Sequence, residues 1–122
     1  MGIRESGEDY LETILVLEQS KGFVRAVDMA ERLEVSKASV SKALANLQRE
    51  GYASVVGRDV RLTGKGRSRA ESVWERHVFF YELLVAAGVD PETASDEACR
   101  MEHCLSQDSF RRLRTSLGRF SD

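Results

Sequence analysis

Residues 26–62 constrain the fold of this 122-residue chain more than any other segment. The stretch "AVDMAERLEV" has the apolar spacing of a short helix, and "SKASVSKALANLQREGY" that of a second helix, capped by Ser36 and stopped by Gly51. Two short helices joined by a tight turn predict a helix-turn-helix. The side chains expected to face the interior are Val27, Ala30, Leu33, Val40, Leu44 and Leu47.

Two short β-rich runs follow the second helix. The runs "YASVV" and "VRL" flank "GRD", a compact turn that contains Gly57. A β-hairpin directly after a helix-turn-helix is a wing, so these residues predict a winged helix-turn-helix. The expected fold class is therefore mainly α with a small β-hairpin wing.

Helical patterns account for the rest of the chain. The amphipathic stretch "SGEDYLETILVLEQSKG" predicts a helix before the helix-turn-helix. The three helices expected after the wing run from the cap Thr63 to Gly88, from the cap Asp90 to Leu105, and from Ser106 to near Gly118. We expect two domains, a winged helix-turn-helix at residues 1–70 and a helical domain at residues 71–122.

The net charge of −2 hides a basic segment. Residues 36–69 contain eight Lys and Arg residues and two acidic residues, a balance of +6, so the remainder carries −8. Localised positive charge on a helix-turn-helix and its wing indicates an anionic partner such as double-stranded operator DNA. A winged helix that serves only as a protein-interaction module is the alternative, and the basic bias argues against it.

The second helix of such a pair enters the major groove of DNA, with its N-terminal residues at the base edges. Small side chains there let the backbone approach the bases, and Ala38 can pack on a thymine methyl group. Basic side chains would chiefly contact phosphates. The candidate DNA-binding residues are Ser36, Lys37, Ala38, Ser39, Ser41, Lys42, Arg58 and Lys65, and the four basic ones among them are expected to contact chiefly phosphates.

The stretch "EACRMEHC" gathers three potential metal ligands. Cys99, Glu102 and His103 are spaced i, i+3 and i+4, so they would share one face of a helix. His77, the only other histidine, lies on the apolar face of the long helix and is expected to point inward. The ordinary explanations are a core histidine bonded to a carbonyl group and a cysteine that serves as a small hydrophobic residue.

Asp9 and Glu12 are spaced i and i+3 in the first helix, where they could simply serve the helix dipole. Together with the four residues above, they would supply two imidazoles, three carboxylates and one thiol on three helices. This donor set suits a divalent transition metal. Oxygen and nitrogen favour Mn²⁺ or Fe²⁺, whereas sulfur favours Fe²⁺, Co²⁺ or Zn²⁺.

The motifs "EDYLETI", "LTGKG", "RH" and "DEACRMEHCLS", with the winged helix, resemble the diphtheria-toxin-repressor family of metal-dependent regulators, and especially its short manganese-transport-regulator branch. The resemblance implies a homodimeric repressor, not an enzyme, that binds operator DNA when Mn²⁺ or Fe²⁺ occupies a site between the first helix and the dimerisation helices. Residues 71–122 would be the metal-binding and dimerisation domain. The implied metal-site residues are Asp9, Glu12, His77, Cys99, Glu102 and His103.

The resemblance is a hybrid of two subtypes. Asp9 follows the manganese-responsive members, whereas Cys99 follows the iron-responsive members and replaces a Glu that helps to hold two ions. Tyr81 and Ser95 stand where iron-type members have ancillary ligands, so no ancillary site is expected. The chain is also too short for the SH3-like third domain of the longer members, and whether it holds one ion or two stays open.

Other functions remain as alternatives. A winged-helix regulator controlled by thiol redox chemistry or by a small organic effector would use Cys99 as a sensor. A metalloenzyme is less favoured, because no separate general base is evident. No apolar run is long enough to span a membrane, and the spacing of Cys99 and Cys104 does not favour a disulfide, so we expect a cytoplasmic location.

Overall fold

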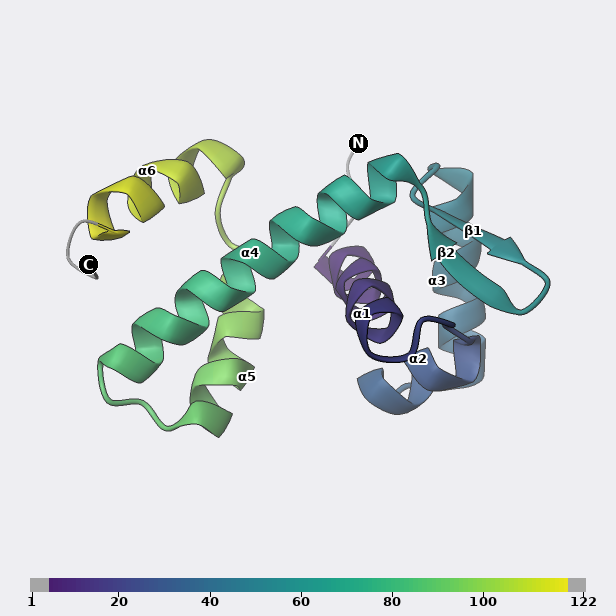
Figure 1. The fold of residues 1–122 in the computed structure, drawn as a ribbon, viewed down its shortest axis with the longest axis horizontal. Helices are drawn as coiled ribbons and strands as arrows, with labels where there is room; N and C mark the ends of the chain where they lie inside the picture. Colours follow the sequence, from purple (N-terminus) through teal and green to yellow (C-terminus); the bar gives the residue numbers. More distant parts are fainter. Residues whose placement is uncertain (1–4, 119–122) are drawn as a thin grey trace. The chain divides into compact units, whose positions relative to one another are not determined.

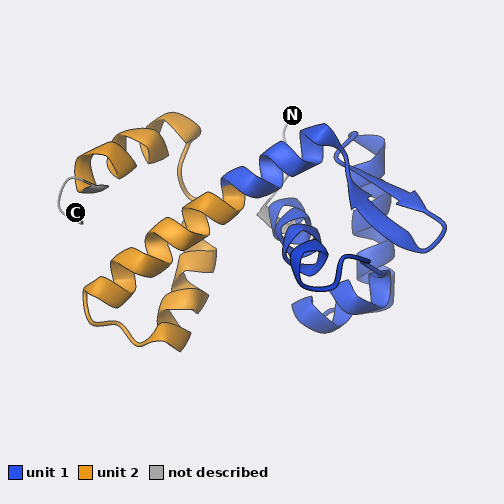
Figure 2. Cartoon of the chain, viewed as in Figure 1, with its two compact units in different colours: residues 1–72 blue, residues 73–122 orange. Residues whose placement is uncertain are grey.

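The computed structural model describes residues 5–118 of the chain. Within that range, helices and one small sheet form two compact units, unit 1 up to Ser72 and unit 2 from Val73 onward (Figures 1 and 2). The elements are α1 (Glu5–Lys21), α2 (Ala26–Leu33), α3 (Lys37–Arg49), β1 (Ala53–Val56), β2 (Asp59–Leu62), α4 (Gly64–Ala86), α5 (Pro91–Met101) and α6 (Gln107–Gly118). The expected fold class, mainly α with a β-hairpin wing, is confirmed. The functional division at residues 70 and 71 remains a prediction.

The helix-turn-helix of unit 1 is formed by local signals in the sequence. Gly22, with a φ of 78°, ends α1, and Glu34, with a φ of 56°, ends α2 in the left-handed region. The hydroxyl group of Ser36 then accepts a hydrogen bond from the N–H of Ser39 at 3.1 Å and caps α3. The short turn between α2 and α3 therefore has a polar cap on one side and a left-handed residue on the other.

Apolar faces of α1, α2 and α3 form the core of unit 1, together with residues of the hairpin. The expected burial of Val27 is wrong, because this side chain is 37% exposed whereas Met29 is fully buried. At 100° per residue, Val27 lies on the far side of α2 from Met29. The apolar side chains of this unit that are at most 2% exposed are Leu11, Ile14, Leu15, Val24, Met29, Val40, Leu47, Val60 and Ala70.

The wing is an antiparallel hairpin in which Ala53 pairs with Leu62 and Val56 pairs with Asp59. Its turn has only two residues, because Asp59 begins β2 instead of belonging to the turn as expected. The buried carboxylate of Asp59 accepts a hydrogen bond from the N–H of Val24 at 3.2 Å, and the N–H of Val60 donates to the carbonyl of Val24 at 2.8 Å. These two bonds fasten the wing to the segment between α1 and α2.

Unit 2 packs α5 and α6 on the C-terminal part of α4. Phe80, Ala98 and Phe110 are buried at its centre, and the ring of Phe79 meets Phe110 edge-on at 5.5 Å between centroids. Asp90 caps α5 as expected, since its carboxylate accepts a hydrogen bond from the N–H of Thr93 at 3.1 Å.

The predicted extension of α5 to Leu105 is wrong, because the helix ends at Met101. The chain then turns, and the hydroxyl group of Ser106 accepts a hydrogen bond from the N–H of Ser109 at 3.1 Å at the start of α6. Ser106 therefore caps α6, which begins where expected.

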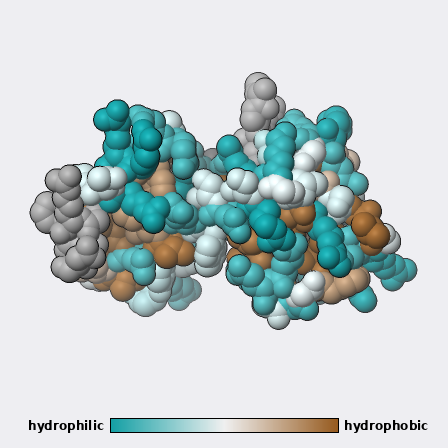
Figure 3. All heavy atoms as spheres, turned by 45° about the horizontal axis from the view of Figure 1, so that its top comes forward, coloured by the Kyte–Doolittle hydropathy of each residue, from teal (hydrophilic) through white to brown (hydrophobic). Residues whose placement is uncertain are grey.

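The face of the molecule drawn in Figure 3 is mainly hydrophilic, with apolar residues reaching it in both units. Among the described residues, the larger exposed hydrophobic side chains are Phe23, Val27, Val35, Val55, Val56, Leu83 and Val85. Between residues 5 and 118, no helix is both long enough and apolar enough to cross a membrane.

Candidate metal centre and nucleic-acid interface

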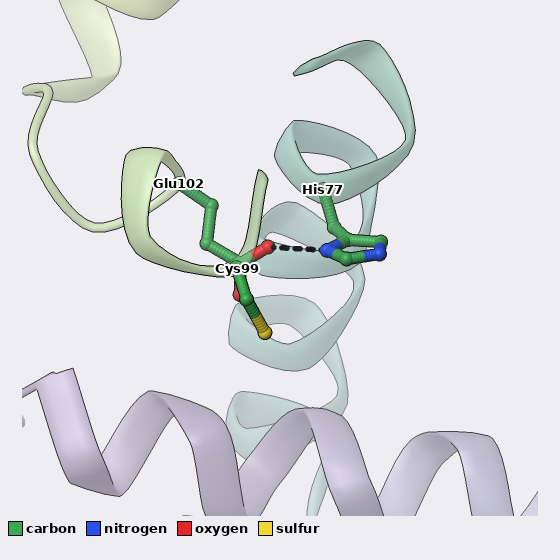
Figure 4. Close-up of side chains that lie close together, drawn as sticks. All are labelled: His77, Cys99 and Glu102. Atoms are coloured by element: carbon green, nitrogen blue, oxygen red, sulfur yellow. Dashed lines mark hydrogen bonds and ion pairs between the residues drawn. The ribbon is translucent and has the colours of Figure 1, made fainter. Parts of the chain in front are cut away.

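Three of the predicted metal ligands come together in unit 2. A ring nitrogen of His77 on α4, the sulfur of Cys99 on α5 and a carboxylate oxygen of Glu102 just after α5 all lie within 4.8 Å of one another. Figure 4 shows the carboxylate of Glu102 directed toward the ring of His77. Although α5 ends at Met101, Cys99 and Glu102 still lie one helical turn apart, because the N–H of Glu102 donates a hydrogen bond to the carbonyl of Ala98 at 3.0 Å.

The ring of His77 is held in one orientation. It stacks on Trp74, with 5.4 Å between ring centroids, and on Tyr81, with 6.4 Å between centroids. Its Nδ1 atom lies 3.1 Å from Oε2 of Glu102, and in the tautomer that carries the proton on Nδ1 the ring donates to this carboxylate. Stacking and this hydrogen bond together fix the orientation of the ring.

Glu102 is the residue that best fits a bound cation. It is 1% exposed, and its Oε1 atom accepts no hydrogen bond from the residues that the structure describes. Nε2 of His103 lies 3.4 Å from Oε1 without forming a hydrogen bond to it, and this ring carries a charge only when it is protonated. Because burying a carboxylate oxygen without a donor is costly, a cation at this position would compensate the charge.

The remaining predicted ligands are not part of this cluster. His103 was expected on the same helical face as Cys99, but α5 has already ended, and its ring does not join the group within 4.8 Å. Asp9 and Glu12 lie one turn apart on α1, which belongs to unit 1. A site that includes these two residues requires both units and stays a prediction.

The donor set in unit 2 is one imidazole nitrogen, one thiol sulfur and one carboxylate oxygen. Such mixed N, S and O donors fit a divalent transition metal better than Ca²⁺ or Mg²⁺, which prefer oxygen alone. Three donors do not complete a coordination sphere, so further ligands would come from other residues or from water.

The predicted DNA-contacting residues of α3 form an exposed surface. Ser36, Lys37, Ala38, Ser39, Ser41 and Lys42 are all exposed, whereas Val40 between them faces the core. Arg58 is exposed in the two-residue turn of the wing. The start of α3 and the tip of the wing can therefore both contact a ligand outside unit 1.

Lys65 has a structural role that its sequence position did not indicate. Its ammonium group donates a hydrogen bond to the carbonyl of Glu50 at 2.9 Å and lies 4.3 Å from the centre of the Tyr52 ring. A lysine at the C-terminal end of α3 also interacts favourably with the helix dipole. Lys65 is thus already bound at the C-terminal end of α3.

Sequence reasoning missed the contacts of three residues around His77. Trp74 and Tyr81 flank it at i−3 and i+4, so helical spacing could have indicated this stack. Arg76 bonds to residues 26 to 31 positions later in the chain, and no local pattern identifies such partners.

A helix-turn-helix with a β-hairpin wing, followed by a helical unit with a cluster of metal-type ligands, defines a class of two-domain DNA-binding regulators. The chain belongs to the iron-dependent repressor family. Residues 3–59 match the family's N-terminal DNA-binding domain, and residues 63–122 match its metal-binding and dimerisation domain. The family resemblance found in the sequence motifs is confirmed.

Similar proteins cover most of this chain. Transcriptional regulator MntR of Escherichia coli O157:H7 is 39% identical over 88% of this chain and 70% of its own length. Iron-dependent repressor IdeR of Mycobacterium leprae is 40% identical over 89% of this chain and 48% of its own length. A solved manganese-dependent transcriptional repressor in complex with manganese is 31% identical, with a TM-score of 0.82 over 92% of this chain and 52% of that one. The chain therefore spans about half the length of the latter two proteins.

Proposed function

We propose that this chain is a cytoplasmic metal-dependent transcriptional repressor that binds operator DNA as a homodimer when Mn²⁺ or Fe²⁺ is bound. The observation that carries the proposal is the cluster of His77, Cys99 and Glu102, in which one buried oxygen of Glu102 accepts no hydrogen bond from the described residues. This cluster lies in the part of the chain that matches the metal-binding and dimerisation domain of the family. It supports a metal-sensing role in preference to catalysis.

The complete site would include Asp9 and Glu12 of α1 and His103, in addition to the cluster. Without a cation, the carboxylates of Asp9, Glu12 and Glu102 repel one another and disfavour the arrangement that brings them together. A divalent cation reverses this interaction and shifts the population toward the DNA-binding geometry. Because the two binding events are coupled, DNA must tighten metal binding by the same factor.

The DNA contact proposed here uses the exposed start of α3 in the major groove, with Arg58 and lysines of α3 on phosphates. In a dimer, two copies of α3 would fit successive major grooves. The physiological ion is Mn²⁺ or Fe²⁺, in line with similar proteins that carry manganese or iron in their names. Zn²⁺ and Co²⁺ also suit the donor set in vitro. Affinity alone follows the Irving–Williams order, in which both ions bind more tightly than Mn²⁺ or Fe²⁺, and the thiol of Cys99 favours them further.

The decisive experiment is DNA binding followed by fluorescence anisotropy on a pool of duplex sequences, first with EDTA and then with anaerobic Mn²⁺ or Fe²⁺. We expect metal to increase the affinity by about 5- to 150-fold. The variant Glu102→Gln keeps the shape of the side chain but loses its charge, so it should lose this increase. Glu97→Gln removes a carboxylate from the exposed face of α5 and should respond like the parent.

Equal DNA binding with and without metal would refute the proposal. In that case the thiol of Cys99 would be the next candidate sensor, and oxidation of the protein should change its DNA affinity. Failure to bind duplex DNA at low salt, in either state, would instead favour a protein-interaction module.

A further inference from the structure

Arg76 fastens the turn that follows α5. Its Nη1 atom donates to the carbonyl oxygens of Glu102 at 3.0 Å and of Leu105 at 2.5 Å, and its Nη2 atom donates to Oε1 of Gln107 at 2.8 Å. Its guanidinium carbon also lies 5.3 Å from the centre of the Phe110 ring. One side chain of α4 thus reaches the end of α5, the connecting turn and the first two turns of α6.

The turn between α5 and α6 contains backbone carbonyl groups that need hydrogen-bond donors. After α5 ends at Met101, the carbonyl groups of residues 102–105 are no longer part of a regular helix. Carbonyl groups at a helix end must find donors elsewhere, and the planar guanidinium group can serve several acceptors at once. Arg76 supplies donors to both ends of this turn.

The position of Arg76 next to His77 gives this contact a consequence for the cluster. Arg76 binds the backbone of Glu102, while His77 meets the carboxylate of the same residue at 3.1 Å. Adjacent residues of one helix therefore hold the main chain and the side chain of Glu102. Any loosening at Arg76 would let the carboxylate move away from the imidazole ring.

We propose that Arg76 is a positioning residue of the candidate metal centre, which fixes the turn at residues 102–107 so that the carboxylate of Glu102 faces His77. This role rests on the proposed metal-sensing function. Arg76 itself contributes no ligand, because a guanidinium group stays protonated and has no acceptor atom. Residues that orient metal ligands in this way typically change metal affinity by roughly 10- to 100-fold when replaced.

The test variant is Arg76→Lys, which keeps the positive charge but replaces the planar fork with a single ammonium group. One ammonium group cannot reproduce the guanidinium contacts to both carbonyl oxygens and to Gln107. The matched control is Arg114→Lys, because Arg114 of α6 pairs with Glu75 of α4 at the surface and does not contact the turn. Both variants replace an arginine by lysine, and in both the arginine links α4 to the segment that contains α6.

Binding of Mn²⁺ can be followed by the fluorescence of Trp74, which is the only tryptophan and stacks on His77. We expect Arg76→Lys to weaken Mn²⁺ binding by roughly 10- to 100-fold. Arg114→Lys should stay within about twofold of the parent, because exposed ion pairs contribute little. The absorption spectrum of the Co²⁺ complex at saturation should also differ for Arg76→Lys, since the ligand geometry has changed.

Three results would overturn the proposal. Parent-like Mn²⁺ affinity of Arg76→Lys would show that the turn is positioned without Arg76. Equal losses in both variants, or a lower thermal unfolding midpoint of metal-free Arg76→Lys with an unchanged Co²⁺ spectrum, would show a general effect on stability. If the parent protein itself does not bind Mn²⁺ or Co²⁺, the proposed function is wrong and the positioning role is wrong with it.

Discussion

Gly66 lies where the first turn of α4 meets the segment that leaves α3. A Cβ atom added at this position would lie 1.7 Å from the carbonyl oxygen of Tyr52 and 2.7 Å from its carbonyl carbon. Both atoms belong to the backbone, so no flexible side chain can move aside. Replacing Gly66 with Ala therefore forces α4 and the end of α3 apart.

The loss in the free energy of unfolding of Gly66→Ala can be worked out from the three hydrogen bonds that cross this contact. Each bond contributes about 0.5–1.5 kcal/mol, so loss of two or all three of them costs about 1–4.5 kcal/mol. The strain expected for overpacking a tight contact, about 1–3 kcal/mol, has a similar size. The bonds at risk are Thr63 N–H to Tyr52 O at 3.1 Å, Thr63 Oγ–H to Gly51 O at 2.6 Å and Lys65 Nζ–H to Glu50 O at 2.9 Å.

The assay is equilibrium unfolding in urea, with Gly64→Ala as the matched control. An added Cβ at Gly64 meets no atom within 4 Å, so this change should stabilise the protein by about 0.4–1 kcal/mol through the unfolded chain. The same substitution two residues apart is thus expected to change stability in opposite directions. A Gly66→Ala protein at least as stable as the parent would refute the reasoning.

Two further changes test the packing and the electrostatics of unit 2. Phe110→Ala should reduce the free energy of unfolding by about 3–5 kcal/mol, measured in urea, because it removes a ring buried against Phe79 and Phe80; a loss below about 1 kcal/mol would contradict this packing. Hydrogen bonds from the side-chain hydroxyl and then the backbone N–H of Thr93 hold the pKa of Asp90 below its usual value of 3.8. The stability contributed by this carboxylate is therefore present above that value and lost as the pH falls through the lower folded-state pKa, so the parent should exceed Asp90→Asn in stability at about pH 6 and lose that advantage at about pH 2. An advantage that persists at the acid end would show that the charge of Asp90 is not its source.

Local signals in the sequence were sufficient for most helix ends in both units. Ser36 and Asp90 cap their helices as expected, and Gly22, Gly51 and Gly88 end helices with positive φ. Each of these signals acts within a few residues, where the chain has few alternatives. The error at Val27 arose because a short helix carries too few apolar residues to define its buried face.

Helical spacing was sufficient to predict only those parts of the candidate site that lie on one helix turn. Cys99 and Glu102 are one turn apart, and the structure brings them together with His77. His103 depended on α5 continuing to Leu105, and the helix ends before it. Contacts such as those of Arg76 join distant segments, so they depend on the packing of α4 against α5 and α6.

Counting charges along the sequence overestimated the basic surface, because it leaves out ion pairs between segments that are distant in the sequence. The balance of +6 for residues 36–69 omits Glu8 and Glu18 of α1, which the fold pairs with Arg69 and Arg67, so the local balance falls to +4. Lys65 is bound to a carbonyl group, and Arg61 pairs with Asp59 at 2.5 Å. Of the eight basic residues, those without an ion pair or hydrogen bond to any residue between 5 and 118 are Lys37, Lys42, Arg49 and Arg58. Each phosphate neutralised on duplex DNA contributes about −0.9 to the slope of log affinity against log salt, so the salt dependence should correspond to about four phosphate contacts per subunit and not eight.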